Sequence, residues 1–135
     1  MLLLTRALNL NTTAATSNFS DVATGSYYYD AIAAAKALGI AQGTNNKFYP
    51  NATITREDAM VLALRAMSVS GTSVVPGTST DLTSYTDNGS VSSYASEAIA
   101  TLIKTGVITG SDGKIYLKNN ITRVEAAAVI YRIKY

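Results

Sequence analysis

The sequence ITREDA at Ile54–Ala59 recurs as ITRVEA at Ile121–Ala126, and each copy has the features of a helix start. A threonine hydroxyl at the N-cap accepts a hydrogen bond from a backbone N–H in the first turn. The acid three residues later, Asp58 or Glu125, is placed to bond back to the N-cap amide, as in a capping box, although aspartate is a shorter variant. Two helices are therefore predicted to begin at Thr55 and Thr122.

Each copy also places an arginine, Arg56 or Arg123, in the first helical turn. A cation at this position opposes the helix macrodipole and costs about 0.3 kcal/mol or more. Its repetition in the same setting favours a functional role. The alternative is that each arginine covers apolar surface with its stem and keeps its charged head in water. The local sequence leaves both interpretations open.

Composition excludes several classes of protein. The 135 residues are 47% hydrophobic and 15% charged, which is typical of a folded chain, and the net charge of +2 does not favour a nucleic-acid partner. The absence of histidine and cysteine removes the usual zinc ligands, thiol nucleophiles and the Ser-His-Asp triad. We expect no metal, cofactor or catalytic residue. The apolar start, Met1–Leu4, is too short for a membrane span or a signal sequence.

The chain contains an internal repeat. Residues 27–67 align without a gap on residues 94–134, an offset of 67. The matched residues are Ala31-Ile32, Gly39-Ile40, Gly43, Lys47, Tyr49, Ile54, Thr55, Arg56, Ala59 and Arg65 on Ala98-Ile99, Gly106-Val107, Gly110, Lys114, Tyr116, Ile121, Thr122, Arg123, Ala126 and Arg132. Just upstream, Phe19-Ser20-Asp21 matches Tyr85-Thr86-Asp87 at an offset of 66. The chain therefore has two copies of one unit.

Each unit has the pattern of helix, loop, helix, which predicts an all-α fold. Apolar residues at helical spacing precede a glycine stop in the first helix, and a core stripe follows the capped threonine in the second. In the loops, Asn45-Asn46 and Asp112-Gly113 are turn dipeptides that suit a small hairpin. The predicted helices are 28–38, 55–67, 94–105 and 122–134.

The start of the chain resembles the end of such a unit. Residues 1–10 align with residues 60–69, which predicts the tail helix of an earlier repeat whose front half is absent; a coincidental apolar helix is the alternative. The predicted organisation is a truncated first repeat with its linker (1–18), a repeat (19–69), a linker (70–84) and a repeat (85–135). The two polar linkers suit solvated connectors.

These residues together resemble the S-layer homology (SLH) domain family. The family pattern has an aromatic-x-Asp-Val start, a helix ending in Gly-Ile/Val, a glycine, Phe-x-Pro and an Ile-Thr-Arg-Ala-Glu helix start. The first complete unit has Phe19-Ser20-Asp21-Val22, Gly39-Ile40, Gly43, Phe48-Tyr49-Pro50 and ITRED at 54–58. The second has Tyr85-Thr86-Asp87, Gly106-Val107, Gly110, Ile115-Tyr116-Leu117 and ITRVE at 121–125. Glu57 or Val124 replaces the motif alanine, Asp58 replaces the first glutamate, and the second copy lacks the proline.

The resemblance implies an all-α, three-lobed pseudo-trimer of SLH repeats on the bacterial cell surface. It implies a noncovalent anchor that binds a secondary cell-wall polysaccharide, often through a pyruvate ketal, in grooves between neighbouring lobes. Arg56 and Arg123 are then the leading ligand contacts, and the site is shaped by Thr55, Thr122, Asp58 and Glu125. The resemblance also implies that Gly43 and Gly110 let the backbone approach the sugar.

The chemistry of these residues agrees with an acidic sugar as the ligand. A guanidinium meets a planar carboxylate with two parallel charge-assisted hydrogen bonds. A helix start adds free N–H groups and a positive dipole end. Tyr49 and Tyr116, or the cluster Tyr27–Tyr29, offer flat faces and hydroxyls, although tyrosines at a helix start usually pack. Lys47 and Lys114 are either ligand contacts or solvated loop charges.

Two other functions remain as alternatives. The repeats suit a structural self-assembly segment of a surface lattice, which would not need the motif arginines. For an enzyme with two carboxylates, Asp21, Asp30, Asp87 and Glu97 are available, but each lies near a helix start, where an acid is expected. The truncated N-terminal unit would also leave an apolar face uncovered, which predicts a homodimer or altered packing of residues 1–10.

Overall fold

The computed structural model describes residues 6, 8–10 and 17–134. This part of the chain contains helices and isolated β-bridges but no β-strand. Each repeat contributes one helix before its loop and one after it. The elements are α2 (Tyr29–Ala37), α3 (Arg56–Ser70), α4 (Ser79–Leu82), the 3-10 helix η1 (Asn88–Ser90), α5 (Ser96–Thr105) and α6 (Arg123–Lys134). The predicted all-α class is confirmed for these residues. None of their helices has the length and hydropathy that crossing a bilayer requires.

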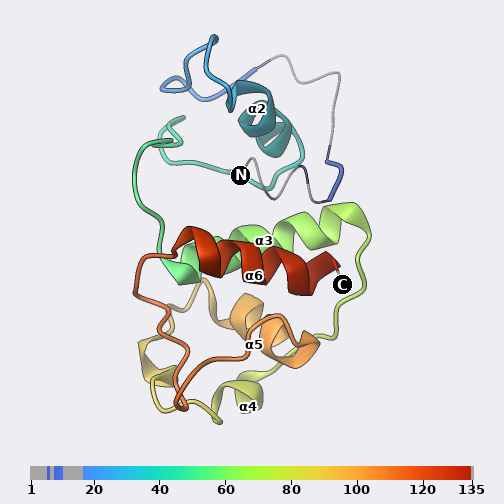
Figure 1. The fold of residues 1–135 in the computed structure, drawn as a ribbon, viewed down its shortest axis with the longest axis vertical. Coiled ribbons are helices and arrows are strands. Elements are labelled where there is room, and N and C mark those ends of the chain that lie inside the picture. The colour runs from blue at the N-terminus through green and yellow to red at the C-terminus, as the bar shows by residue number, and fades with distance from the viewer. Residues whose placement is uncertain (1–5, 7, 11–16, 135) are drawn as a thin grey trace.

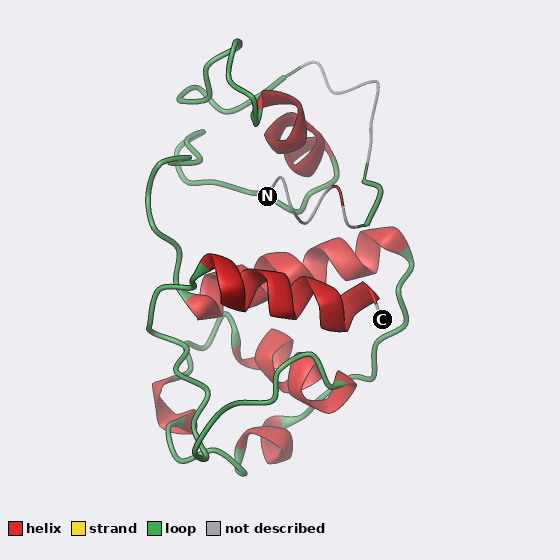
Figure 2. Cartoon of the chain, in the orientation of Figure 1, coloured by secondary structure: helices red, strands yellow, loops and turns green. Residues whose placement is uncertain are grey.

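The second helices of the two repeats, α3 and α6, run in the same direction through the middle of the molecule (Figure 1). In that view α2 lies above them, and α5 and α4 lie below. Long loops connect these helices at the margins of the molecule (Figure 2). The two ITR motifs consequently lie at the same end of the central helices, where Ile121 N donates to the carbonyl of Ile54.

The predicted helix ends and hairpins are present in both repeats. Gly106 ends α5 at φ 92°, and Gly39 follows the C-cap of α2 at φ 76°. Asn45 and Asn46 have φ of 51° and 59°, as a type I′ turn requires, and a bridge joins the flanking residues Thr44 and Lys47. Ser111 and Lys114 form the same bridge in the other repeat.

One apolar core connects the two repeats. Ile40, Met60 and Met67 from the first complete repeat and Ile99 and Leu102 from the next are almost fully buried in a single cluster. Burial of an aliphatic or methionine side chain stabilises the fold by about 1.5–3 kcal/mol. The repeats therefore form one packed body, in which the positions of the two motifs depend on each other.

Most of the segment between the repeats is exposed, as expected from its composition, but it is anchored to α5 at several points. Its helix α4 lies against α5, and Leu82 is buried. Upstream, the N–H of Gly77 donates to Thr101 Oγ1 and the N–H of Val75 donates to Thr105 Oγ1, both at 3.1 Å. The threonines of α5 satisfy backbone groups that solvent would otherwise bind. The sequence signal for this contact was the spacing of Thr101 and Thr105, which places both side chains on the same face of α5.

Most of the predicted first-repeat tail and its linker, residues 1–5, 7 and 11–16, lies outside the described residues. Of the remainder, Leu10 is buried in the common core, and Leu8 packs against it. Arg6 is exposed and lines a cavity described below.

Candidate functional site

The start of α3 is closed by the following repeat. Thr55 Oγ1 accepts from the N–H of Asp58 at 3.2 Å, which confirms the predicted cap. The first two N–H groups of the helix, those of Arg56 and Glu57, donate to the carbonyls of Asn119 and Leu117 at 2.8 and 3.0 Å. The sequence analysis expected these N–H groups to bind an anion, but they already donate to backbone carbonyls of the protein.

Arg56 is held in an ion pair at this closed start. Its Nη1 donates to Glu125 Oε2 on the first turn of α6, and 19% of its side chain is exposed. Its Nε is buried and has no partner among the described residues. The expected bidentate contact of this guanidinium with a ligand therefore competes with Glu125.

The start of α6 is open. Thr122 Oγ1 accepts from the N–H of Glu125 at 3.2 Å, so the predicted cap is present here too. Within the described residues, however, the N–H groups of Arg123 and Val124 have no acceptor. Both side chains are exposed, Val124 by 80%. In the same part of the chain, the Arg123 guanidinium has neither a hydrogen bond nor an ion pair.

A cavity of about 490 Å³ lies beside this open start. Its walls come from α2 and the residues before it, the loop that precedes α3, and the facing sides of α3 and α6. Most of its lining is apolar, and Arg123, Thr122 and Arg6 bring polar groups to it. Tyr27 and Tyr28 also line it, with their rings edge to face at 5.0 Å between centroids. An apolar concave site with a few polar groups is typical of a ligand pocket.

Arg6 is a cavity residue that the sequence analysis did not single out. It aligns with Arg65 and Arg132, whose Nη1 atoms donate to the carbonyls of Ile40 and Val107 at 3.2 Å. Those two arginines support a loop of their own repeat. The alignment of residues 1–10 with 60–69 was the available signal, but it indicates a structural arginine and not a cavity residue.

The two motif acids do not complete a capping box, which corrects one expectation. Asp58 Oδ1 accepts from the Tyr94 hydroxyl at 2.5 Å, and Glu125 pairs with Arg56. The hydrogen bond to Asp58, helped by burial and by the charges of Asp58 and Glu57, raises the pKa of Tyr94 to about 12. Both acids therefore connect the repeats instead of returning to their own N-caps.

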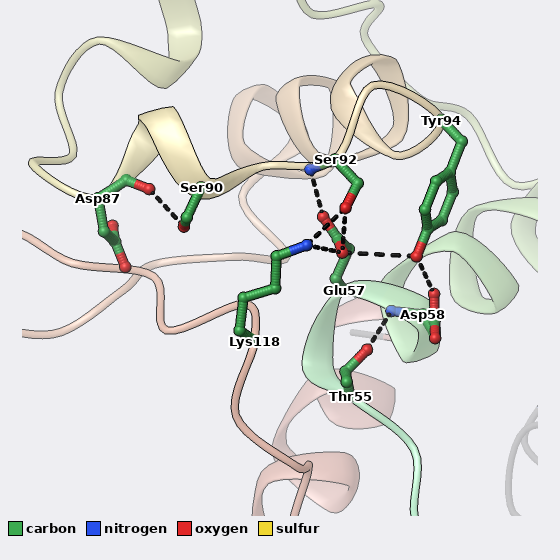
Figure 3. A network of polar contacts seen from close by, with 8 residues as sticks. All are labelled: Thr55, Glu57, Asp58, Asp87, Ser90, Ser92, Tyr94 and Lys118. Carbon is green, nitrogen blue, oxygen red and sulfur yellow. Dashed lines mark hydrogen bonds and ion pairs between the residues drawn. The ribbon is translucent and has the colours of Figure 1, made fainter.

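Glu57 forms a polar network that sequence reasoning missed (Figure 3). Its side chain is 2% exposed and accepts hydrogen bonds from the Ser92 N–H and hydroxyl, the Tyr94 hydroxyl and the Lys118 ammonium. Burial raises the pKa of Glu57, but the bonds from Lys118 and Ser92 outweigh it and hold the pKa below its ordinary value. The signal was the acid at the place of the motif alanine, which the sequence analysis noted only as a departure.

Asp21 and Asp87 hold the loops that carry Tyr49 and Tyr116. Asp21 accepts from the N–H groups of Phe48 and Tyr49 at 2.9 and 2.7 Å, and the Phe48 bond is the main reason that its pKa is lowered. Asp87 accepts from Ile115 and Tyr116, and these bonds lower its pKa against the opposing effect of burial. Among the candidates for an acid pair, these two are therefore structural.

Tyr49 and Tyr116 are exposed by 55% and 38%, and neither lines the cavity. Both have positive φ, 58° and 52°, which is uncommon for a bulky residue. The aspartate bonds to their N–H groups hold this backbone. Their proposed contact with a sugar would therefore be separate from the cavity.

Gly43 and Gly110 are explained by packing inside each repeat. A Cβ on Gly43 would lie 2.6 Å from both the Phe19 ring and the Lys47 carbonyl oxygen, at φ +64°. A Cβ on Gly110 would meet the Tyr85 ring and the Lys114 carbonyl in the same way. These contacts account for both glycines without a ligand. Lys47 and Lys114 are exposed beside them and do not line the cavity.

The fold and this site define the class of protein: a helical repeat module that has an arginine-bearing cavity between its packed repeats. The S-layer homology domain family matches the chain at residues 18–60 and 84–127. The chain belongs to this family and contains two SLH repeats, which confirms the resemblance. SLH domains attach proteins to the cell surface by binding cell-wall polymers.

Three relatives illustrate where such repeats occur. The chain is 35% identical over 127 residues to an amylopullulanase of Thermoanaerobacterium thermosulfurigenes and to exoglucanase XynX of Acetivibrio thermocellus, covering 93% of this chain and 7% and 12% of those proteins. It is also 35% identical over 120 residues to a surface-layer 125 kDa protein of Lysinibacillus sphaericus, covering 85% of this chain and 10% of that protein. The chain thus spans only a small part of the length of these relatives.

Proposed function

We propose that this module anchors its protein noncovalently to the cell envelope by binding an anionic, pyruvylated secondary cell-wall polysaccharide. The observation that carries the proposal is the open start of α6, which adjoins a cavity. Among the described residues, Arg123 has no ion-pair partner there and two N–H groups have no acceptor. A pyruvate ketal carries a carboxylate on a sugar ring. The guanidinium and the helix start suit its charge, and the apolar cavity wall suits the ketal methyl group and the ring face.

The predicted site residues have unequal parts in this proposal. Arg123 and Thr122 lie on the cavity, so we assign them the primary contact. The relative position of the two helix starts is set by the Arg56–Glu125 pair, together with Thr55 and Asp58. Tyr49 and Tyr116 are proposed as outlying sugar contacts, next to the loops that Gly43 and Gly110 allow to close.

The proposal includes the three-lobed arrangement implied by the resemblance, with residues 1–10 in the place of a first repeat's second helix. Burial of Leu10 in the common core supports it. The homodimer predicted through this segment stays a prediction, which light scattering over a range of concentrations tests. A concentration-independent monomer would contradict it.

Binding to purified cell-wall sacculi, before and after chemical removal of pyruvate, tests the function. We expect the chain to sediment with untreated sacculi and to stay in the supernatant after depyruvylation. The matched control for charge is Lys104→Ala, because Lys104 is an exposed cation on α5 outside the cavity. Equal binding to both kinds of sacculi would refute the pyruvylated ligand, and equal binding of Arg123→Ala and Lys104→Ala would refute the site.

A further inference from the structure

We propose that Ser92, Tyr94 and Lys118 form a carboxylate receptor at the boundary between the repeats, and that Glu57 occupies it as an internal ligand. The receptor is distinct from the cavity beside Arg123, because neither its three residues nor Glu57 lines that cavity. Its ligand class is a small carboxylate, including the carboxylate of an acidic sugar.

The contacts of the Glu57 carboxylate are those expected for a bound anion (Figure 3). The Ser92 N–H lies 2.6 Å from Oε1, and the Ser92 hydroxyl lies 2.9 Å from Oε2. Lys118 Nζ is 2.8 Å from Oε2, and the Tyr94 hydroxyl is 3.4 Å from it. A backbone amide, two hydroxyls and an ammonium therefore converge on one carboxylate, so both of its oxygens are satisfied.

The donors of the receptor come from the repeat at residues 85–135, whereas the Glu57 carboxylate comes from the repeat at residues 19–69. Within the second repeat, Lys118 Nζ also donates to Ser92 Oγ, so two of the donors contact each other directly. The chain next to Lys118 is fixed because the Leu117 and Asn119 carbonyls accept from the start of α3. The donors therefore have anchors that do not depend on the Glu57 side chain.

The equivalent sequence positions in the other repeat lack both the carboxylate and its strongest donors. At the offset of 67, Glu57 becomes Val124, Lys118 becomes Asn51 and Ser92 becomes Gly25. At the equivalent sequence positions, neither the acid nor the Ser92 and Lys118 donors are repeated. The carboxylate and its donors are therefore particular to this boundary and are not a general feature of the repeat.

The receptor borders solvent, because two of its donor side chains are exposed. Glu57 is buried, but the Lys118 side chain is 51% exposed and Tyr94 is 64% exposed. A small anion therefore has a short route to the site once the Glu57 carboxylate is removed.

Rescue of Glu57→Ala by acetate tests the receptor. The substitution deletes one methylene carbon and the carboxylate, and acetate has the same heavy atoms. We expect acetate to raise the Tm of Glu57→Ala in a saturable way, by about 4 °C at an acetate concentration tenfold above its Kd. Chloride at equal ionic strength should not do so. The matched control is Glu97→Ala, which removes an exposed acid from the first turn of α5.

The double variant Glu57→Ala/Lys118→Met shows whether the rescue uses this site, because it should lose the response to acetate. If Glu57→Ala is unfolded, the same titration is followed as recovery of helical circular dichroism. A response to acetate no larger than the response to chloride, or one that persists in the double variant, overturns the proposal.

The assignment of an acidic sugar to this receptor rests on the proposed function. With Glu57 in place the receptor is closed, so the wild-type chain should bind a pyruvylated wall fragment at the Arg123 cavity alone. Calorimetry should then find one site in the wild type and a second in Glu57→Ala. Acetate rescue without a second wall-fragment site would overturn only the sugar assignment. Failure of the wild type to bind the fragment would refute the proposed function and leave the acetate result unaffected.

Discussion

The starts of α3 and α6 have nearly the same sequence but different surroundings. At α3 the first two N–H groups donate to carbonyls of the next repeat, Arg56 is paired and Glu57 is buried. At α6 the equivalent N–H groups have no acceptor among the described residues, and Arg123 and Val124 are exposed. A motif of this kind therefore contributes to packing where a neighbouring repeat covers it, and is available to a ligand where none does.

The largest expected difference between the two starts is in ligand binding. Arg123→Ala should weaken binding of pyruvylated wall polymer about 10- to 100-fold, because a hydrogen bond to a charged group contributes about 1.5–3 kcal/mol. Arg56→Ala removes a partly exposed ion pair and should weaken binding less than about fivefold. Affinities from calorimetry with a wall fragment check both values. Equal losses for the two variants would contradict the comparison.

The next largest difference is in stability, at the fourth position of the two motifs, Glu57 and Val124. Glu57→Ala should lower the free energy of unfolding by about 2 kcal/mol, because the part-buried Ser92 N–H and the Lys118 ammonium lose their acceptor. Val124→Ala should change it by less than about 0.5 kcal/mol, since this side chain is exposed. Urea denaturation of both variants measures the two changes. A Val124→Ala loss as large as that of Glu57→Ala would show that α6 is covered in solution.

The helix caps should differ little between the starts. Thr55→Ala and Thr122→Ala each remove one bond from a side-chain oxygen to a first-turn N–H, at the same distance of 3.2 Å. Each substitution should cost about 1 kcal/mol. Thermal unfolding of the two variants compares them directly. If only Thr55→Ala destabilised the chain, the cap of α6 would not be formed in solution.

The smallest expected effect is on the pH dependence of stability. The pKa of Glu57 is lower in the folded chain than its ordinary 4.5, so the unfolded chain binds more protons in the acid range. The stability that Glu57 contributes is complete above pH 4.5 and is lost as the pH falls through the folded pKa. Glu57→Gln should therefore differ most from the wild type near neutral pH, and the difference should narrow below pH 4.5. A constant difference in urea midpoint from pH 7 to pH 3 would contradict this.

Helices and their order could be predicted from the sequence because the signals are local. Threonine caps, glycine stops and the repeat at an offset of 67 depend on residues close together in the chain, and the observed α2, α3, α5 and α6 lie within a few residues of their predicted ranges. The anchoring of the connector to α5 was not predictable from its polar composition. It depends on Thr101 and Thr105, which accept bonds from a segment more than twenty residues away.

The candidate site was predicted only in part, because contacts between repeats decide it. Arg123 and Arg56 are equivalent in sequence, and no local pattern distinguishes the one on the cavity from the one paired with Glu125. Asp58 suited a capping box, but a tyrosine hydroxyl from the next repeat takes its carboxylate. Glu57 was the most informative departure from the family pattern, since a buried acid in place of alanine requires donors from elsewhere.

The anchoring of the connector to α5 affects how the chain transmits a pulling force. Because backbone groups near Gly77 are bonded to α5, and a Cβ on Gly77 would lie 2.2 Å from the backbone of Ala100, this segment has little slack. Tension along the chain would therefore reach both repeats together, instead of first extending a loose tether. A module of this construction should yield abruptly under shear, with both repeats detaching in one event.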